Sequence, residues 1–217
     1  MSVALRRRDV VKALLRDRGE ILVVAGLGSS AWDCTAAGDH PLTFPLWGAM
    51  GSACMIGLGL ALAQPERRVL VVTGDGEMLM GLGSLATLGA QRPRNLAIVV
   101  LDNERYGETG MQKTHTAHGV DLAAAARACG FVKARVIRKI SEVASMRADV
   151  FRGRGPVFFQ VKVKPDSPPL VLPPRDGAHL ARRFREALLG RRAMGRQDPT
   201  VPSRLRRKSP RVPVAAA

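Results

Sequence analysis

The chain has 217 residues, of which 46% are hydrophobic, and a formal net charge of +16. This length is sufficient to bury a core and is typical of one domain. No apolar run reaches the roughly 18 residues that a membrane-spanning helix needs, so a membrane protein is not expected.

The three cysteines, Cys34, Cys54 and Cys129, are scattered and form no Cys-x-x-Cys pair. Their number and spacing argue against a disulfide framework and an iron–sulfur ligand set, and they fit a reducing compartment. The basic run 6–8 is followed by further charged residues rather than by the apolar segment of a secretory signal. We therefore expect a cytoplasmic protein.

The positive charge is concentrated near the C-terminus. The segment from Arg182 to Arg211 holds eleven Arg or Lys residues and two acidic residues, so nine of the sixteen net charges lie there. A basic tail can bind nucleic acid, but this one has no interleaved aromatic residues to stack on bases and matches no nucleic-acid-binding motif. We expect the tail, 191–217, to be disordered and a nucleic-acid partner to be unlikely.

An amphipathic helix is expected from Val3 to Arg18, and a strand from Glu20 to Ala25. The next segment, 26–31, reads GLGSSA, which has the spacing of the dinucleotide-binding fingerprint. That fingerprint requires a helix, a second strand and an acidic residue about 20 positions on. Pro41, Pro45 and several glycines follow instead, so a dinucleotide site is the less favoured interpretation.

The central part of the chain predicts a strand–helix–strand unit. After an apolar helix over 53–63, the β-branched run 69–72 predicts a buried strand that ends in Thr73-Gly74-Asp75-Gly76. The two glycines permit a backbone turn that is closed to residues with side chains. A helix is expected from Glu77 to Gln91, then a second buried strand, 96–101, followed by Asp102-Asn103.

This unit places two polar side chains together. A helix of about 15 residues spans roughly 22 Å, and a strand of about six residues spans roughly 20 Å. A right-handed unit therefore brings Asp75 and Asn103 to the same edge of a parallel sheet, where open α/β sheets bind ligands. Carboxylate and amide oxygens suit Mg²⁺, which also takes phosphate oxygens. The helix that starts near Glu77 offers unpaired N–H groups to those phosphates.

The order GDG, 26 intervening residues and Asn103 resembles the thiamine diphosphate motif of the pyruvate-decarboxylase-like superfamily. The segments GDGEMLMGLGSLATLG and DNERYGETGMQ are most similar to sulfopyruvate decarboxylase β subunits and to the C-terminal half of phosphonopyruvate decarboxylases. The alternative is an ordinary strand–helix–strand unit with a surface Asp75 and a turn Asn103.

The resemblance implies a set of site residues. It implies metal binding by Asp75, Asn103 and the backbone carbonyl of Arg105. The same match implies cofactor contacts from Gly74, Asp75, Gly76, Asn103, Tyr106 and the backbone N–H of Glu77. In the preceding segment, it implies that the Gly48 carbonyl binds the aminopyrimidine and that Met50 is the apolar wedge that bends the cofactor. The alternative for Met50 is a core position beside a glycine-rich helix start.

The loop 104–112 is too polar and glycine-rich for a strand and is long for a plain connection, so a functional or mobile loop is expected. Thr109-Gly110 and Gln112 are similar to a Thr-Gly-x-Gln element of the phosphonopyruvate and sulfopyruvate enzymes. His115 and His118 have helical spacing, but no third metal ligand is evident, and surface or capping roles are favoured.

The remaining pattern predicts a helix over 121–129, a strand over 131–137, a helix over 141–151 with Ser141 as its N-cap, and a strand over 157–163. Continued alternation predicts a doubly wound, mainly parallel α/β sheet with helices on both faces. We expect one cofactor-binding domain, 1–164. A Pro-rich linker and an outer helix, together 165–190, should follow, and then the tail.

The resemblance also implies that a glutamate on a separate pyrimidine-binding domain activates the cofactor. Only 73 residues precede Gly74, and the strands and helices of this domain account for them. We therefore expect a partner subunit to supply that glutamate, and the chain alone to be inactive.

These observations predict the diphosphate- and Mg²⁺-binding subunit of a thiamine diphosphate-dependent 2-oxoacid decarboxylase with a sulfopyruvate- or phosphonopyruvate-like substrate. Arg105, Lys113 and the two histidines could attract the extra anionic group. One alternative is another split thiamine diphosphate enzyme. It could be an acetolactate-synthase-like ligase or a 2-oxoacid oxidoreductase, and the absence of clustered cysteines disfavours the oxidoreductase. Another alternative is a non-catalytic cofactor-binding domain.

Overall fold

The computed structural model describes residues 5–190, so the tail predicted to be disordered, 191–217, lies outside the described residues. Six parallel strands form one sheet in the order β2-β1-β3-β4-β8-β7. The strands are β1 (Leu22–Ala25), β2 (Thr43–Pro45), β3 (Val69–Gly74), β4 (Leu96–Asp102), β7 (Lys133–Ile137) and β8 (Val157–Lys162).

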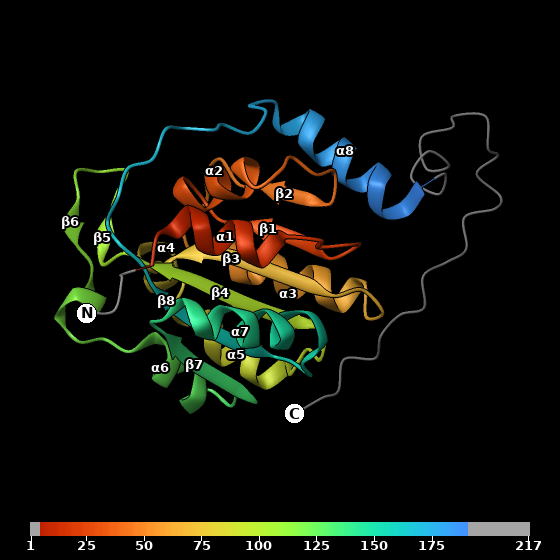
Figure 1. Ribbon diagram of the computed structural model, residues 1–217. Coiled ribbons are helices and arrows are strands. Elements are labelled where there is room, and N and C mark those ends of the chain that lie inside the picture. The colour runs from red at the N-terminus through yellow and green to blue at the C-terminus, as the bar shows by residue number, and fades with distance from the viewer. Residues whose placement is uncertain (1–4, 191–217) are drawn as a thin grey trace, which may run out of the picture.

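Helices cover both faces of this sheet (Figure 1). One face carries α1 (Arg7–Leu15), α2 (Ser29–Ala36) and α7 (Ile140–Arg152). The other face carries α3 (Ala53–Ala63), α5 (Ser84–Gln91) and α6 (Leu122–Ala128). The predicted doubly wound, parallel α/β fold is therefore confirmed.

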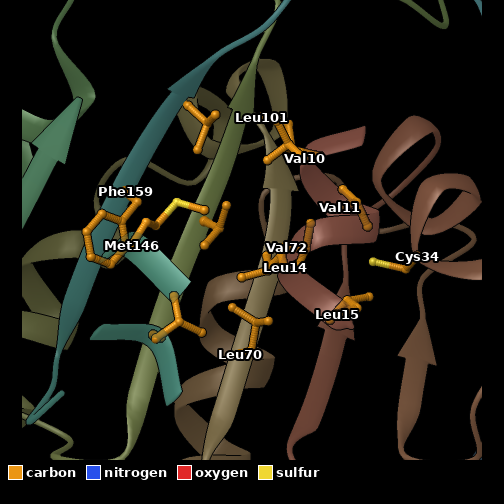
Figure 2. Close-up of a cluster of buried hydrophobic side chains, with 14 of the residues drawn as sticks. Val10, Val11, Leu14, Leu15, Cys34, Leu70, Val72, Leu101, Met146 and Phe159 are labelled. Carbon is orange, nitrogen blue, oxygen red and sulfur yellow. The ribbon is translucent and has the colours of Figure 1, made fainter. Parts of the chain in front are cut away.

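The central strands are apolar because both of their faces are buried. Along β3, Leu70 and Val72 pack into the core beneath α1, whereas Val69 and Val71 pack into the core on the opposite face. This alternation follows the two-residue period of a strand. Figure 2 shows Leu14 of α1 beside the β3 side chains in the first of these cores.

The helix expected from Glu77 to Gln91 is wrong in two respects. The structure has two helices, α4 (Asp75–Met80) and α5, separated by a glycine-containing turn, and the first of them begins two residues earlier than expected. The break occurs at Gly81, which packs closely against Gly51. Only glycine fits there, because a Cβ on Gly81 would lie 2.2 Å from the Gly51 carbonyl oxygen. Glycine is also a poor helix former, which weakens the chain at this point.

The expected N-cap of α7 is also wrong. The helix begins at Ile140 with Lys139 as its N-cap, so Ser141 is already helical. The carboxylate of Glu142 accepts the backbone N–H groups of Arg138 and Lys139, at 2.9 and 2.8 Å. An N3 glutamate that satisfies free N–H groups in this way fixes the start of the helix upstream of the serine.

Several short elements were not expected. The glycine-rich segment after β1 continues into α2, and β2 follows despite Pro41 and Pro45, because a short edge strand tolerates proline at its end. No acidic residue directly follows β2, so the dinucleotide interpretation still lacks its ribose-binding group. The loop after Asn103 contains an antiparallel pair, β5 (Arg105–Tyr106) and β6 (Gln112–Lys113), which contradicts the expectation that it was too polar for strands. We call residues 105–113 the hairpin.

A short 3-10 helix, η1 (His115–His118), follows the hairpin. Beyond β8, an extended segment leads to α8 (Gly177–Leu189), the expected outer helix. This helix lies beside β2, where Phe184 packs against Phe44 with ring centroids 5.6 Å apart. The predicted domain boundaries remain a prediction. Within residues 5–190, none of the helices combines the length and apolar character needed to cross a bilayer.

The position of the core gives a direct stability test. Leu70→Ala should lower the free energy of unfolding by about 2–5 kcal/mol, because the wild-type side chain is fully buried on a central strand. Leu62→Ala is the matched control and should stay within about 0.5 kcal/mol, since Leu62 on α3 is 53% exposed. Urea unfolding measures both. Equal effects of the two substitutions would contradict the assigned core.

Candidate active site at the ends of β1, β3 and β4

A pocket lies where the strand order of the sheet reverses, between β1 and β3. From β1 the chain continues to the edge strand β2, whereas from β3 it continues to β4 on the other side. Such a switch point leaves a crevice at the carboxyl ends of the strands, the usual ligand site of open α/β sheets. The pocket is lined by Arg7, Leu27, Ser29, Ser30, Met50, Gly74, Asp75, Gly76, Glu77, Leu101, Asn103, Arg105, Tyr106, Gly107, Glu108 and Thr109.

Asp75 is the first residue of α4 and is only 1% exposed. Its Oδ2 atom accepts hydrogen bonds from the hydroxyl groups of Thr114, at 2.5 Å, and Thr116, at 3.3 Å. Burial raises the pKa of the Asp75 carboxyl to about 6; the hydrogen bond from Thr114 lowers it, and the nearby charge of Asp102 raises it. No Lys, Arg or His within the described part of the chain forms a salt bridge with Asp75. Among these residues, the carboxylate is therefore buried without a cation at salt-bridge distance.

Asn103 and Arg105 lie on the same side of the pocket as Asp75. Gly74 at the end of β3 is in register with Leu101 near the end of β4, so the residues that follow the two strands meet at one edge. The side-chain Oδ1 of Asn103 accepts the backbone N–H of Arg105 at 3.0 Å. The structure thus brings Asp75 and Asn103 to one pocket, as expected from the strand–helix–strand geometry, together with Arg105, which the resemblance had added.

Neither glycine of the GDG segment is needed for unusual backbone angles, and only Gly76 is needed for space. Gly74 has φ −94° and ψ 163°, and Gly76 lies within α4, so the expected turn closed to other residues is wrong. A Cβ on Gly76 would lie 2.6 Å from two ring carbons of Tyr106. A Cβ on Gly74 would meet no protein atom within 4 Å and would project into open space where the residue lines the pocket.

Glu77 is buried beneath the loop that begins at Gly26, directly after β1. Its Oε2 accepts the hydroxyl of Thr73 at 2.8 Å, and a Cβ on Gly26 would lie 2.0 Å from the same oxygen. Burial raises the pKa of Glu77, although Thr73 and the backbone N–H groups of Ala53, Leu27 and Gly51 oppose the shift. Gly26 therefore makes room for this carboxylate.

Comparison with known proteins places this pocket in a family. The model of the thiamine pyrophosphate enzyme C-terminal TPP-binding domain matches residues 28–161, a range that contains most of the pocket. The chain belongs to the thiamine pyrophosphate enzymes. The resemblance drawn from GDG and Asn103 is confirmed.

Individual relatives agree with this assignment. The chain is 38% identical over 186 residues to the sulfopyruvate decarboxylase subunit beta of Methanothermobacter thermautotrophicus, and the match covers 86% of this chain and 97% of that one. It is 41% identical over 164 residues to the phosphonopyruvate decarboxylase of Streptomyces viridochromogenes, covering 75% of this chain but 41% of that one. The crystal structure of benzoylformate decarboxylase from Polynucleobacter necessarius shares the fold, with a TM-score of 0.63, 21% identity, and coverage of 76% of this chain and 34% of that chain.

The two residues expected upstream of the GDG segment are placed differently. Met50 lines the pocket from the loop between β2 and α3, next to Ala49 and Gly51, which both have positive φ. Gly48 is exposed and does not line the pocket. The structure is compatible with a pocket role for Met50 and offers no such support for Gly48; both roles remain predictions.

The residues suggested as anion-binding groups are also separated. Arg105 lines the pocket, whereas Lys113, His115 and His118 are exposed and do not line it. In residues 5–190, no cluster of three or more His, Cys, Asp or Glu side chains is arranged for metal binding.

Sequence reasoning missed Arg7, a pocket residue whose side chain is 7% exposed. Its Nε atom bonds to the fully buried Asp33, which also pairs with Arg8 at 3.0 Å. A signal was present, because Arg7 occupies the same helical stripe as Val10 and Leu14, and a charged residue on a buried apolar stripe requires an explanation.

The contact between Gly76 and Tyr106 predicts that the effect of Gly76→Ala on stability depends on the presence of the Tyr106 ring. Gly76→Ala should destabilise the wild-type protein by about 1–3 kcal/mol, since the Tyr106 ring must move. In a Tyr106→Ala background, the same change should be neutral or stabilising by up to about 1 kcal/mol, because glycine disfavours helix. Urea unfolding of the four proteins closes the double-mutant cycle. Gly74→Ala, which meets no atom, is the control; a Gly76→Ala effect that is identical in both backgrounds would refute the contact.

Proposed function

We propose that this chain is the diphosphate- and Mg²⁺-binding subunit of a two-subunit thiamine diphosphate-dependent 2-oxoacid decarboxylase. The observation that carries the proposal is the meeting of Asp75, Asn103 and Arg105 at the pocket of a thiamine pyrophosphate enzyme domain. A cytoplasmic location remains a prediction and rests on the three free cysteines.

The donor set fits a magnesium diphosphate group. Mg²⁺ takes oxygen ligands and binds through one or two carboxylates together with substrate phosphates. Asp75 would supply the carboxylate, Asn103 its amide oxygen and Arg105 its backbone carbonyl. The fit is supported by the buried charge of Asp75, whose burial a cation would offset. When bound, thiamine diphosphate supplies the electron sink for decarboxylation, and these residues fix its diphosphate end.

A partner subunit is supported by the comparisons. The chain matches almost the whole length of a relative named subunit beta, but less than half the length of a phosphonopyruvate decarboxylase whose name mentions no subunit. In our proposal the partner supplies the glutamate that activates the pyrimidine ring. This chain contributes Met50 and Tyr106 beside the cofactor, and the site is completed at the interface of the two subunits.

An extra anionic group on the substrate is supported by Arg7. Its Nε binds Asp33, and its two terminal nitrogens form no hydrogen bond within residues 5–190 although the residue lines the pocket. The facing group is Glu108 of the hairpin. Burial raises the pKa of Glu108, and the charge of Arg7 only partly opposes this shift. Arginine binds phosphonate or sulfonate oxygens through two parallel hydrogen bonds. A phosphonopyruvate- or sulfopyruvate-like substrate would place that group against Arg7 in exchange for Glu108.

The test of the proposed function compares the chain alone with the complex formed with its co-purified partner. We expect no decarboxylation of phosphonopyruvate or sulfopyruvate by the chain alone. The complex should turn over only with thiamine diphosphate and Mg²⁺. Asp75→Asn should abolish turnover, and Asp9→Asn, on the exposed face of α1, should leave it unchanged. Robust turnover by the chain alone would refute the division of the site. Absence of both a partner and Mg²⁺-dependent cofactor binding would favour a non-catalytic domain.

Substrate recognition by Arg7 has its own control in Arg8, which also pairs with Asp33 but does not line the pocket. Arg7→Gln should lower the ratio of kcat/KM for the phosphonate or sulfonate substrate to kcat/KM for pyruvate by about 10- to 100-fold, the value of a charge-assisted hydrogen bond. Arg8→Gln should leave this ratio unchanged. The ratio cancels losses from impaired folding. Equal ratios in the two variants would show that Arg7 only balances Asp33.

A further inference from the structure

Two buried threonines connect the carboxylates at the ends of β3 and β4. Thr114 and Thr116 follow the hairpin and are 0% and 5% exposed. Their hydroxyl oxygens lie 2.9 Å apart. Thr114 donates to Oδ2 of Asp75 at 2.5 Å, and Thr116 lies 3.3 Å from the same oxygen. Thr116 also contacts Oδ1 of Asp102 at 2.8 Å. The hydroxyl pair therefore separates two buried carboxylates.

Each hydroxyl has a single proton, which limits how these contacts can be used at once. If Thr114 donates to Asp75, the proton of Thr116 is best placed for Asp102, its shorter carboxylate contact. Asp102 has other donors as well, namely Nε2 of Gln160 at 2.6 Å and Nζ of Lys162 at 2.8 Å. Asp75 has no such additional side-chain donor within the described residues. Its carboxylate orientation consequently depends on Thr114 more than on Thr116.

The threonine segment is also attached to the turn that supplies the other predicted metal ligands. The backbone N–H of Thr114 donates to the carbonyl of Glu104 at 3.1 Å, and Glu104 lies between Asn103 and Arg105. The Oδ1 atom of Asp75 accepts no side-chain hydrogen bond among residues 5–190, and Asp75 lines the pocket. One oxygen is held by hydroxyl groups, and the other has no side-chain donor within this range.

We infer that Thr114 and Thr116 are positioning residues for the metal: Thr114 holds Oδ2 of Asp75, Thr116 holds Thr114 in place between the two carboxylates, and Oδ1 of Asp75 is thereby presented as the cation ligand. This inference rests on the proposed function. Groups that hydrogen-bond a metal ligand fix its orientation, and their loss typically weakens metal affinity by about 10- to 100-fold. Thr114 has the larger effect, because it is the principal donor to Asp75.

The experiment uses the complex of the full chain with its co-purified partner and Mn²⁺ as the probe, with millimolar thiamine diphosphate present. Free Mn²⁺ is followed by electron paramagnetic resonance, and the melting temperature is recorded without ligand. Thr114→Val should weaken Mn²⁺ binding by about 10- to 100-fold, and Thr116→Val should weaken it less. Thr114→Ser retains the hydroxyl and should restore affinity close to that of the wild type. Thr87→Val, on the exposed face of α5, is the matched control and should bind as the wild type does.

The outcomes separate this inference from the proposal beneath it. A wild-type complex that binds no Mn²⁺ with thiamine diphosphate overturns both. A wild-type complex that binds Mn²⁺, together with a folded Thr114→Val variant of equal affinity, overturns the positioning role alone. If Thr114→Val does not melt cooperatively, Thr116→Val and Thr114→Ser decide. Unchanged affinity in Thr116→Val, or weakened affinity in Thr114→Ser at an unchanged melting temperature, would refute the hydroxyl role.

Discussion

Two carboxylates, Asp75 and Asp102, are buried at the carboxyl ends of neighbouring parallel strands, and the polar side of the fold is arranged around them. A buried charge is costly unless it is paired and hydrogen-bonded. Asp102 meets that condition within the chain. Burial lowers the pKa of Lys162, but its hydrogen bonds to Asp102 and Glu104 outweigh this effect, so its pKa is raised and it stays charged. Asp75 has only hydroxyl donors from side chains. Within residues 5–190, Asp75 forms no salt bridge, so in the proposed function the Mg²⁺ ion would balance its charge.

The remainder of the fold supports the two buried carboxylates, because it holds the ends of both strands rigidly. Strands β3 and β4 are apolar along their length and covered by a core on each face. Their register is therefore fixed by burial, since a shift of one residue would turn every side chain to the opposite core. The register of β3 and β4 therefore sets the spacing of Asp75 and Asn103. On this side of the site, the strands themselves provide the rigidity.

The parts of the site that follow from strand and helix periodicity could be predicted from the sequence. The apolar run that ends in Gly74, and the one that ends before Asn103, were sufficient to place Asp75 and Asn103 at one edge. The contacts that could not be predicted join residues distant in sequence or depend on side-chain volume. The hydrogen bond from Thr114 to Asp75 spans 39 positions. The requirement for Gly76 arises from the Tyr106 ring, which lies 30 positions further along the chain. No local propensity encodes either contact.

The segment from Glu104 to Thr116 connects the pocket lining with the two buried carboxylates. It supplies Arg105, Tyr106 and Glu108 to the pocket lining, and both hydroxyl groups to the buried carboxylates. Few apolar contacts support its tip, where residues 107–113 are exposed, so its placement depends on the polar contacts at its base. In the proposed function, a cation on Asp75 would strengthen that base, because it would offset the repulsion between Asp75 and Asp102. Ordering of the hairpin and binding of the metal diphosphate group would then be coupled, and each would favour the other by the same free energy.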